Sequence, residues 1–171
     1  DVWLAFGSTA LGAMLLGGMC WYARDPNEME LQIREGFVIV ALAWVILSLV
    51  GALPFVLSGV LDSFTDAFFE TMSAFTTTGA TILGGAGNPQ IEEVPKAILF
   101  WRSLAHWLGG MGIIVLTLAI LPLLGVGGMQ LYKAEVPGPS ADKLTPRVQE
   151  TAKRLWLIYV GITFIEILLL L

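Results

Sequence analysis

The hydroxyl-rich stretch Thr76-Thr77-Thr78-Gly79-Ala80 holds the residues whose types and order could do chemistry. Three consecutive threonines disfavour a continuing helix, because their χ1 freedom is lost against the preceding turn. Gly79 can adopt backbone angles that are closed to other residues. Backbone that leaves a helix has free carbonyl oxygens, and a ring of such oxygens from several loops can replace the hydration shell of a cation. The stretch therefore predicts a cation site made of backbone oxygens.

A short apolar segment must position this stretch. It starts at Phe64 and runs for about a dozen residues, whereas a helix that crosses a bilayer needs roughly 20. We interpret it as a re-entrant half-helix, with Ser63 and Asp66 resembling a capping box at its start. Its carboxyl end carries partial negative charge, which favours a cation just beyond it. Backbone without helical hydrogen bonds is tolerated at membrane depth only inside protein or along a water-filled cavity.

Glu70 and Arg102 are the two ionisable residues expected beside this stretch. Glu70 falls inside the half-helix, and Arg102 falls near the outer end of the next apolar segment. A charged group at the bilayer centre costs about 2.5–3.5 kcal/mol on insertion scales, so we expect the two to form an ion pair behind the extended segment. The guanidinium, with several donors, would also reach a backbone carbonyl. The alternative is that Arg102 extends to the outer interface while Glu70 pairs with backbone amides.

The composition is that of an integral membrane protein. The 171 residues are 56% hydrophobic and 13% charged, with a mean hydropathy of +0.79. Soluble domains usually contain about 25% charged residues. Cys20 is the only cysteine and His106 the only histidine, so the sequence offers no cluster of metal-ligating side chains. The chain begins at Asp1 without a visible signal peptide, and we interpret it as an internal piece of a longer polypeptide.

The apolar segments predict an all-α membrane protein. Its expected core is an outer helix over Gly36–Gly59, a re-entrant pore half-helix with an extended filter strand, and an inner helix over Pro95–Leu124, plus a leading and a trailing membrane helix. We divide the chain into a leading membrane helix (1–23), the first helix–pore loop–helix repeat (24–131), a linker (132–154) and the truncated start of a second repeat (155–171).

Three glycines, Gly109, Gly110 and Gly112, lie near the middle of the predicted inner helix. They indicate close packing of this helix against the half-helix. The alternative is a hinge for gating.

Three motifs carry a resemblance to one family. FFETMSAFTTTGAT (68–81) resembles the first pore loop of the bacterial Trk/Ktr potassium-uptake proteins, most closely the TrkH type. FWRSLAHWLGGMG (100–112) and LPLLGVGGMQL (121–131) are also similar to that family. The resemblance covers about residues 24–171 and is specific when the motifs are taken together.

The resemblance implies potassium uptake across the bacterial inner membrane, with this chain supplying one of four unequal pore repeats. It implies that K⁺, the transported ion, is bound by the backbone carbonyls of Thr77, Thr78, Gly79 and Ala80, with Thr76 flanking them. The implied partners are the remaining pore repeats of the same polypeptide, a second copy in a homodimer, a cytoplasmic nucleotide-binding regulatory ring of the TrkA type, and the lipid bilayer. No nucleic acid is implied.

The basic residues predict the orientation. Seven of the nine Lys and Arg residues fall on one side of the predicted helices, while Lys96 lies in the opposite loop with Arg102 near it. The positive-inside rule makes residues 24–35 and 132–154 cytoplasmic, so the pore loop enters from outside. The seven are Arg24, Arg34, Lys133, Lys143, Arg147, Lys153 and Arg154.

Two other functions remain open from the residues. One is a non-conducting membrane subunit that docks a cytoplasmic partner, in which the Thr-Thr-Thr-Gly run is a buried turn. The other is an intramembrane enzyme that uses Ser103 and His106, which lie one helical turn apart. No oxyanion loop or orienting carboxylate is evident for such an enzyme, and a small polar contact inside a helix bundle explains both residues.

Overall fold

The computed structural model describes residues 1–23, 33–85, 87–120 and 144–171. Within these ranges the chain forms five α-helices and one short 3-10 turn but no strand, which confirms the all-α expectation. Two compact units, Asp1–Gly110 and Met111–Leu171, are described separately below. The elements are α1 (Val2–Ala23), α2 (Ile33–Leu57), α3 (Phe64–Phe75), η1 (Ile91–Glu93), α4 (Lys96–Ile120) and α6 (Leu144–Leu170).

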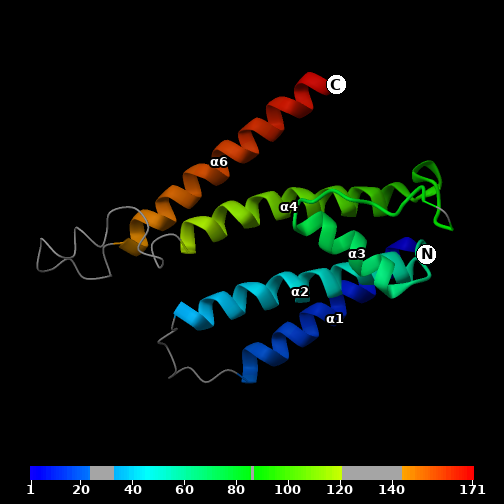
Figure 1. The fold of residues 1–171 in the computed structure, drawn as a ribbon, viewed down its shortest axis with the longest axis horizontal. Helices are drawn as coiled ribbons and strands as arrows, with labels where there is room; N and C mark the ends of the chain where they lie inside the picture. The colour runs from blue at the N-terminus through cyan, green and yellow to red at the C-terminus, as the bar shows by residue number, and fades with distance from the viewer. Residues whose placement is uncertain (24–32, 86, 121–143) are drawn as a thin grey trace, which may run out of the picture. The chain divides into compact units, whose positions relative to one another are not determined.

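Two helices of the first unit, α1 and α2, are long and apolar enough to cross a membrane. The sequence predicted both, although α2 begins three residues before and ends two residues before the expected Gly36–Gly59. Its earlier end follows from Gly59, which takes a left-handed φ of 71° while Val60 N–H bonds the carbonyl of Phe55 at 3.1 Å. In Figure 1, α2 runs back past α1 in the opposite direction.

Helix α3 is the predicted half-helix, and its bounds confirm the expected length of about a dozen residues. Its first turn is capped by Ser63, whose Oγ accepts a hydrogen bond from Asp66 N–H at 3.3 Å. Twelve residues at 1.5 Å each span about 18 Å, well short of a hydrocarbon core of about 30 Å. A helix of this length cannot cross the hydrocarbon core by itself.

The core of the first unit forms where α3 packs between α2 and the first part of α4 (Figure 1). Ala67 and Ala74 of α3 are buried there. Trp101 of α4 contacts two other helices. Its Nε1 donates to the carbonyl of Gly51 in α2 at 3.0 Å, and its ring packs edge-on against Phe6 of α1 with 5.9 Å between the ring centroids. The half-helix is thus enclosed by protein on more than one side.

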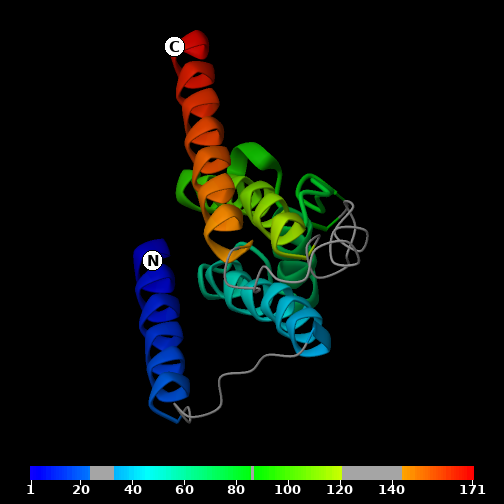
Figure 2. The same cartoon turned by 90° about the vertical axis from the view of Figure 1, so that its left-hand side faces the viewer.

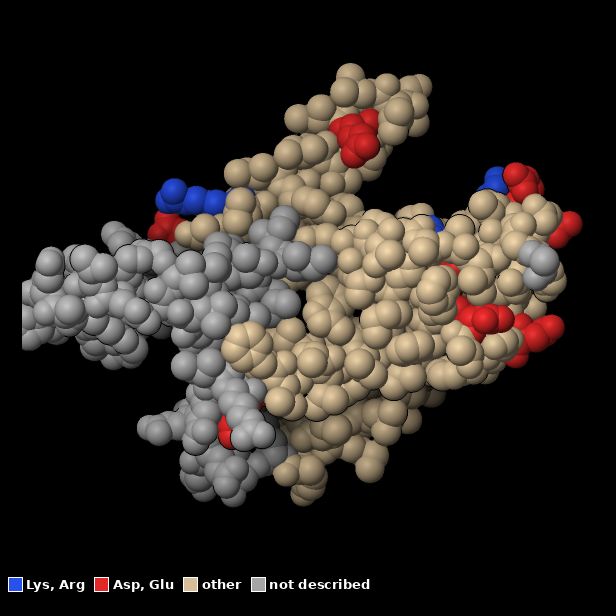
Figure 3. Space-filling model, in the orientation of Figure 1, with Lys and Arg blue, Asp and Glu red and all other residues tan. Residues whose placement is uncertain are grey.

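Most of α1 is exposed in this unit. Only Ala5 and Thr9 are buried, and Figure 2 shows the carboxyl half of α1 standing clear of α2. Large apolar side chains such as Trp3 and Leu11 are exposed on α1, and Leu42 and Ile46 are exposed on α2. In Figure 3 acidic and basic side chains gather at the end of this unit where α3 and α4 begin. This distribution suits a lipid environment.

Helix α6 belongs to the second unit and runs without interruption from Leu144 to Leu170. The expected boundary between residues 154 and 155 therefore falls inside this helix. Glu150 and Arg154 form an exposed ion pair on it at 2.6 Å. The rest of the expected linker, the connector at 24–32 and the third family motif lie outside the described residues.

The backbone of α4 lies very close to the end of α3 at Gly109. A Cβ placed on this residue would lie 2.1 Å from the carbonyl oxygen of Phe75, the last residue of α3. No flexible side chain is available to move away, because the obstacle is backbone. The expectation that the glycines of α4 pack closely against the half-helix is therefore confirmed for Gly109.

We expect Gly109→Ala to destabilise the protein by more than the ~1–3 kcal/mol typical of overpacked sites. The midpoint of thermal unfolding in detergent measures this effect. Gly12→Ala in α1 is the control, because nothing lies within 4 Å of a Cβ at that residue. Equal midpoints for the two variants would contradict the close approach.

Candidate cation site

The backbone that follows α3 changes handedness at alternate residues. Thr76 has φ −77°, whereas Thr77 has φ 58° and Gly79 has φ 74°. Thr77 is the only non-glycine residue with positive φ among the residues that the structure describes. Alternating handedness gathers successive N–H groups on one side of the chain and so turns the carbonyls toward the other. The segment is thus not a flat strand, in which successive carbonyls would alternate in direction.

Thr77 is the strained residue of the segment. A β-branched residue at positive φ is an outlier, and such conformations cost on the order of 1–3 kcal/mol. They persist only where the surroundings over-determine them, and they cluster at functional sites. The sequence predicted unusual backbone angles for Gly79 but not for Thr77, because a threonine gives no signal for positive φ.

The carbonyls of Thr77 and Thr78 are free of hydrogen bonds from any described residue. The neighbouring Thr76 carbonyl accepts from Thr77 Oγ1 at 2.7 Å. The Thr76 hydroxyl bonds back to the carbonyl of Met72 at 2.8 Å and meets Thr78 Oγ1 at 2.9 Å. The side-chain hydroxyls therefore stabilise the turn out of α3, while two adjacent backbone oxygens stay available.

The outer part of the segment, Gly79 and Ala80, is held from two sides. Ser73 of α3 accepts from Gly79 N–H through its carbonyl at 3.2 Å and donates its hydroxyl to the Ala80 carbonyl at 2.6 Å. From α4, Arg102 Nη2 lies 3.4 Å from the Gly79 carbonyl and 3.5 Å from the Ala80 carbonyl. Of the four carbonyls expected to bind a cation, that of Ala80 is the most occupied by the protein itself.

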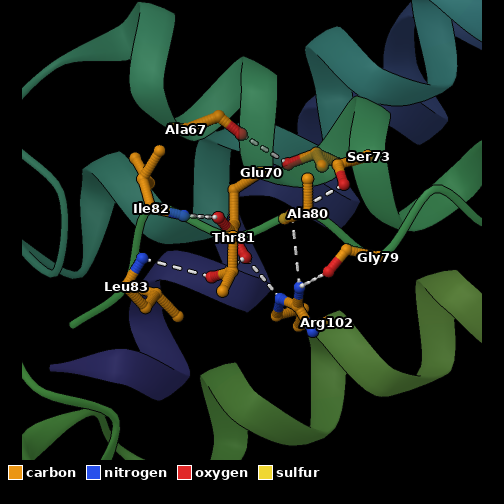
Figure 4. Close-up of polar contacts among 10 residues, drawn as sticks. Ala67, Glu70, Ser73, Gly79, Ala80, Thr81, Ile82, Leu83 and Arg102 are labelled. Atoms are coloured by element: carbon orange, nitrogen blue, oxygen red, sulfur yellow. Dashed lines mark hydrogen bonds and ion pairs between the residues drawn. The ribbon is translucent and has the colours of Figure 1, made fainter. Parts of the chain in front are cut away.

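Glu70 lies at the centre of the contacts behind the segment (Figure 4). Its side chain is fully buried, and one carboxylate oxygen accepts both from Thr81 Oγ1 at 2.8 Å and from Arg102 Nε. The other oxygen accepts from the backbone N–H of Ile82 at 3.0 Å. The structure therefore combines features of the two arrangements expected from the sequence, because Glu70 bonds to the guanidinium and also to a backbone amide.

The described residues offer no side-chain metal centre. No group of three or more His, Cys, Asp or Glu side chains among them could hold an ion. His106 lies next to the segment, with its Cε1 3.5 Å from where a Cβ on Gly79 would sit. Ser103 is exposed, and within the described part of the chain no hydrogen bond joins it to His106.

Two residues that hold the segment were not identified from the sequence, Ser73 and Thr81. Ser73 follows Glu70 by three positions on α3, a spacing that places both side chains on one helix face. That spacing could have revealed Ser73. Thr81 gives no such signal, because its contact with Glu70 depends on how the chain turns back after Gly79.

We predict that Glu70→Gln and Arg102→Gln are each strongly destabilising and that the double change costs less than their sum. Removing one partner of a buried pair strands the other charge and costs about 3–5 kcal/mol. A thermal-unfolding double-mutant cycle in detergent measures the coupling. Glu150→Gln with Arg154→Gln is the matched control, since an exposed helix pair contributes only about 0.3–0.5 kcal/mol. Additive effects at Glu70 and Arg102 would contradict a structural pair.

Comparison with known proteins gives the family. The model of the TrkH family, described as cation transport protein, matches residues 5–171. The Trk system potassium uptake protein TrkH of Escherichia coli K12 is 55% identical over 161 residues, which are 93% of this chain and 32% of that protein. The TrkH of Vibrio parahaemolyticus is 52% identical over 160 residues, which are 92% of this chain and 32% of that protein.

A solved structure agrees with these relatives. The crystal structure of the potassium transporter TrkH from Vibrio parahaemolyticus matches with a TM-score of 0.74 and 45% identity. The match covers 94% of this chain and 30% of that one. The chain thus spans about a third of the length of the relatives it matches. Sequence, fold and family model agree, and the chain belongs to the TrkH family of cation transport proteins.

Proposed function

We propose that residues 76–80 are this chain's share of a potassium selectivity filter in a protein that takes up potassium. The observation that carries the proposal is the pair of unbonded carbonyls at Thr77 and Thr78, held on strained backbone directly after a half-helix. Such strain is retained where it serves a function. The names of the relatives, potassium uptake proteins of the Trk system, support the choice of ion.

The proposed mechanism is replacement of the hydration shell of K⁺ by backbone oxygens. The carbonyls of Thr77, Thr78 and Gly79 are the ligands from this segment, and the partial negative charge at the end of α3 adds to their attraction. One segment cannot enclose an ion, so the remaining ligands come from the other pore repeats of the same polypeptide. Potassium is therefore the transported ion and not a resident cofactor.

The proposed assembly follows the domain division made from the sequence. Residues 24–131 form the first complete repeat, preceded by a leading helix at 1–23 and followed by a linker at 132–154 and the start of a second repeat at 155–171. The protein lies in the bacterial inner membrane as a homodimer, with residues 24–35 and 132–154 facing the cytoplasm. A nucleotide-binding ring of the TrkA type docks on that side. Support comes from the basic residues and from the family.

The two other functions receive less support. An enzyme using Ser103 and His106 lacks a hydrogen bond between them within the described residues, and the relatives are named as uptake proteins. We therefore propose that the chain has no catalytic role. A subunit that only docks a partner would not need the unbonded carbonyls of Thr77 and Thr78, which are held by a backbone strained at Thr77.

Gly79→Ser is expected to lower the potassium-to-sodium permeability ratio about tenfold. A side chain at this left-handed position costs roughly 1–2 kcal/mol, and 1.4 kcal/mol corresponds to a factor of ten. The ratio is measured from ion flux into proteoliposomes that contain the full-length protein. Gly59→Ser is the matched control, because Gly59 has a similar φ of 71° but lies between α2 and α3.

An unchanged ratio in Gly79→Ser, with expression equal to that of the control, would contradict the proposed filter. A fall of the same size in Gly59→Ser would mean that backbone strain anywhere in the unit disturbs selectivity. Wild-type protein without any potassium flux would overturn the proposed function itself.

Cysteine labelling tests the proposed orientation. A cysteine placed at Asn88, in the loop between α3 and α4, is expected to react with a membrane-impermeant thiol reagent added to intact cells. One placed at Ser140, in the linker, is expected to react only after the cells are opened. The exposed Cys20 is first replaced by Ser to remove background. The reverse labelling pattern would contradict the assignment of residues 132–154 to the cytoplasm.

A further inference from the structure

We infer that Ser73 is a positioning residue that limits the ion-binding part of this segment to Thr77, Thr78 and Gly79, by withdrawing the Ala80 carbonyl from the ion. This inference rests on the proposed function and narrows it, since the sequence pattern assigned four carbonyls to potassium. It concerns a residue that lies on α3, behind the segment, and does not itself contact the ion.

The hydrogen bonds to the four carbonyls increase along the segment. Thr77 and Thr78 receive none from the described residues, Gly79 receives one from Arg102, and Ala80 receives one from Ser73 and one from Arg102. A carbonyl oxygen has two lone pairs. At Ala80 both therefore have donors, and the Ser73 contact of 2.6 Å is the shorter of the two.

The direction of the Ala80 carbonyl follows from the position of Ser73. Ser73 is 5% exposed and sits on the face of α3 that also carries Glu70. Figure 4 shows its hydroxyl pointing at Ala80, with the Arg102 side chain reaching the same oxygen from α4. The carbonyl is thus aimed into the protein, between two helices. A potassium ion bound to it would need the oxygen to turn away from both donors.

Arg102 does not distinguish the two outer carbonyls, because its Nη2 lies 3.4 Å from the Gly79 oxygen and 3.5 Å from the Ala80 oxygen. Its charge is matched by the buried Glu70 carboxylate. The hydrogen bond from the Ser73 hydroxyl is therefore the contact that separates Ala80 from Gly79.

Ser73 also fixes the residue before Ala80. Its carbonyl accepts from Gly79 N–H at 3.2 Å, so one residue of α3 holds the peptide group that precedes Gly79 and the peptide group that follows Ala80. Loss of the hydroxyl would leave the bond to Gly79 N–H but remove the shorter of the two bonds to the Ala80 carbonyl, which would then be held only by the 3.5 Å contact with Arg102 and could turn more easily. The ion would then meet an additional, loosely held ligand, and the discrimination between potassium and sodium would weaken.

The test compares Ser73→Ala with Ser48→Ala in the full-length protein in proteoliposomes. Both changes remove one oxygen from a buried serine, but the Ser48 hydroxyl donates to Met72 Sδ of α3 and not to residues 76–80. We expect the potassium-to-sodium flux ratio to fall about fivefold in Ser73→Ala. This is the factor that corresponds to the net free energy of one typical hydrogen bond. Ser48→Ala should keep the wild-type flux ratio. Ser73→Thr, which retains the hydroxyl, should have a flux ratio close to that of the wild type.

Equal ratios in Ser73→Ala and Ser48→Ala would overturn the inference. A second measurement needs no variant: a structure of the wild-type protein in rubidium should show ion density beside the carbonyls of Thr77, Thr78 and Gly79. Density in direct contact with the Ala80 oxygen would also overturn it. If the wild-type protein is selective for potassium and either result appears, the proposed function stands and only the role of Ser73 fails. A wild-type protein without selectivity would instead reject the proposed function.

Discussion

The buried carboxylate of Glu70 is the contact on which the irregular backbone after α3 depends. Non-helical backbone inside a membrane must satisfy its polar groups within the protein. Glu70 does so for Ile82 N–H and for the Thr81 hydroxyl, and it neutralises Arg102. Arg102 in turn reaches the Gly79 carbonyl. The Glu70 carboxylate would be costly to bury alone, but here each of its oxygens accepts a hydrogen bond. This fully satisfied hydrogen-bond network rigidifies the segment.

The strained part of the segment lies between two fixed ends. On one side, Thr76 N–H bonds to Met72 and continues the last turn of α3. On the other, Ser73 and Glu70 hold the chain from Gly79 to Ile82. With both ends fixed, Thr77 has no freedom to relax to negative φ. The carbonyls of Thr77 and Thr78 receive no hydrogen bond from the described residues, whereas the donors from Ser73 and Arg102 are used at Gly79 and Ala80.

Much of this arrangement could be predicted from the sequence, and the reasons are physical. The length of an apolar run gives a half-helix directly, and an acid and a base at membrane depth must find partners, which gives Glu70 and Arg102. The positive φ of Thr77 could not be predicted, because tertiary contacts impose it against the preference of the side chain. The bonds to the Ala80 carbonyl could not be predicted either, since they depend on where Ser73 and Arg102 meet in space.

The separation of Glu70 and Arg102 along the chain has a consequence for how the protein is made. The two residues are 32 positions apart, and Glu70 is synthesised first. At about 5–20 residues per second, the ribosome needs about 2–6 seconds to reach Arg102. During that interval the carboxylate has no guanidinium, and α3 is too short to insert by itself. The half-helix is therefore expected to enter the membrane together with α4, after the ribosome has passed Arg102.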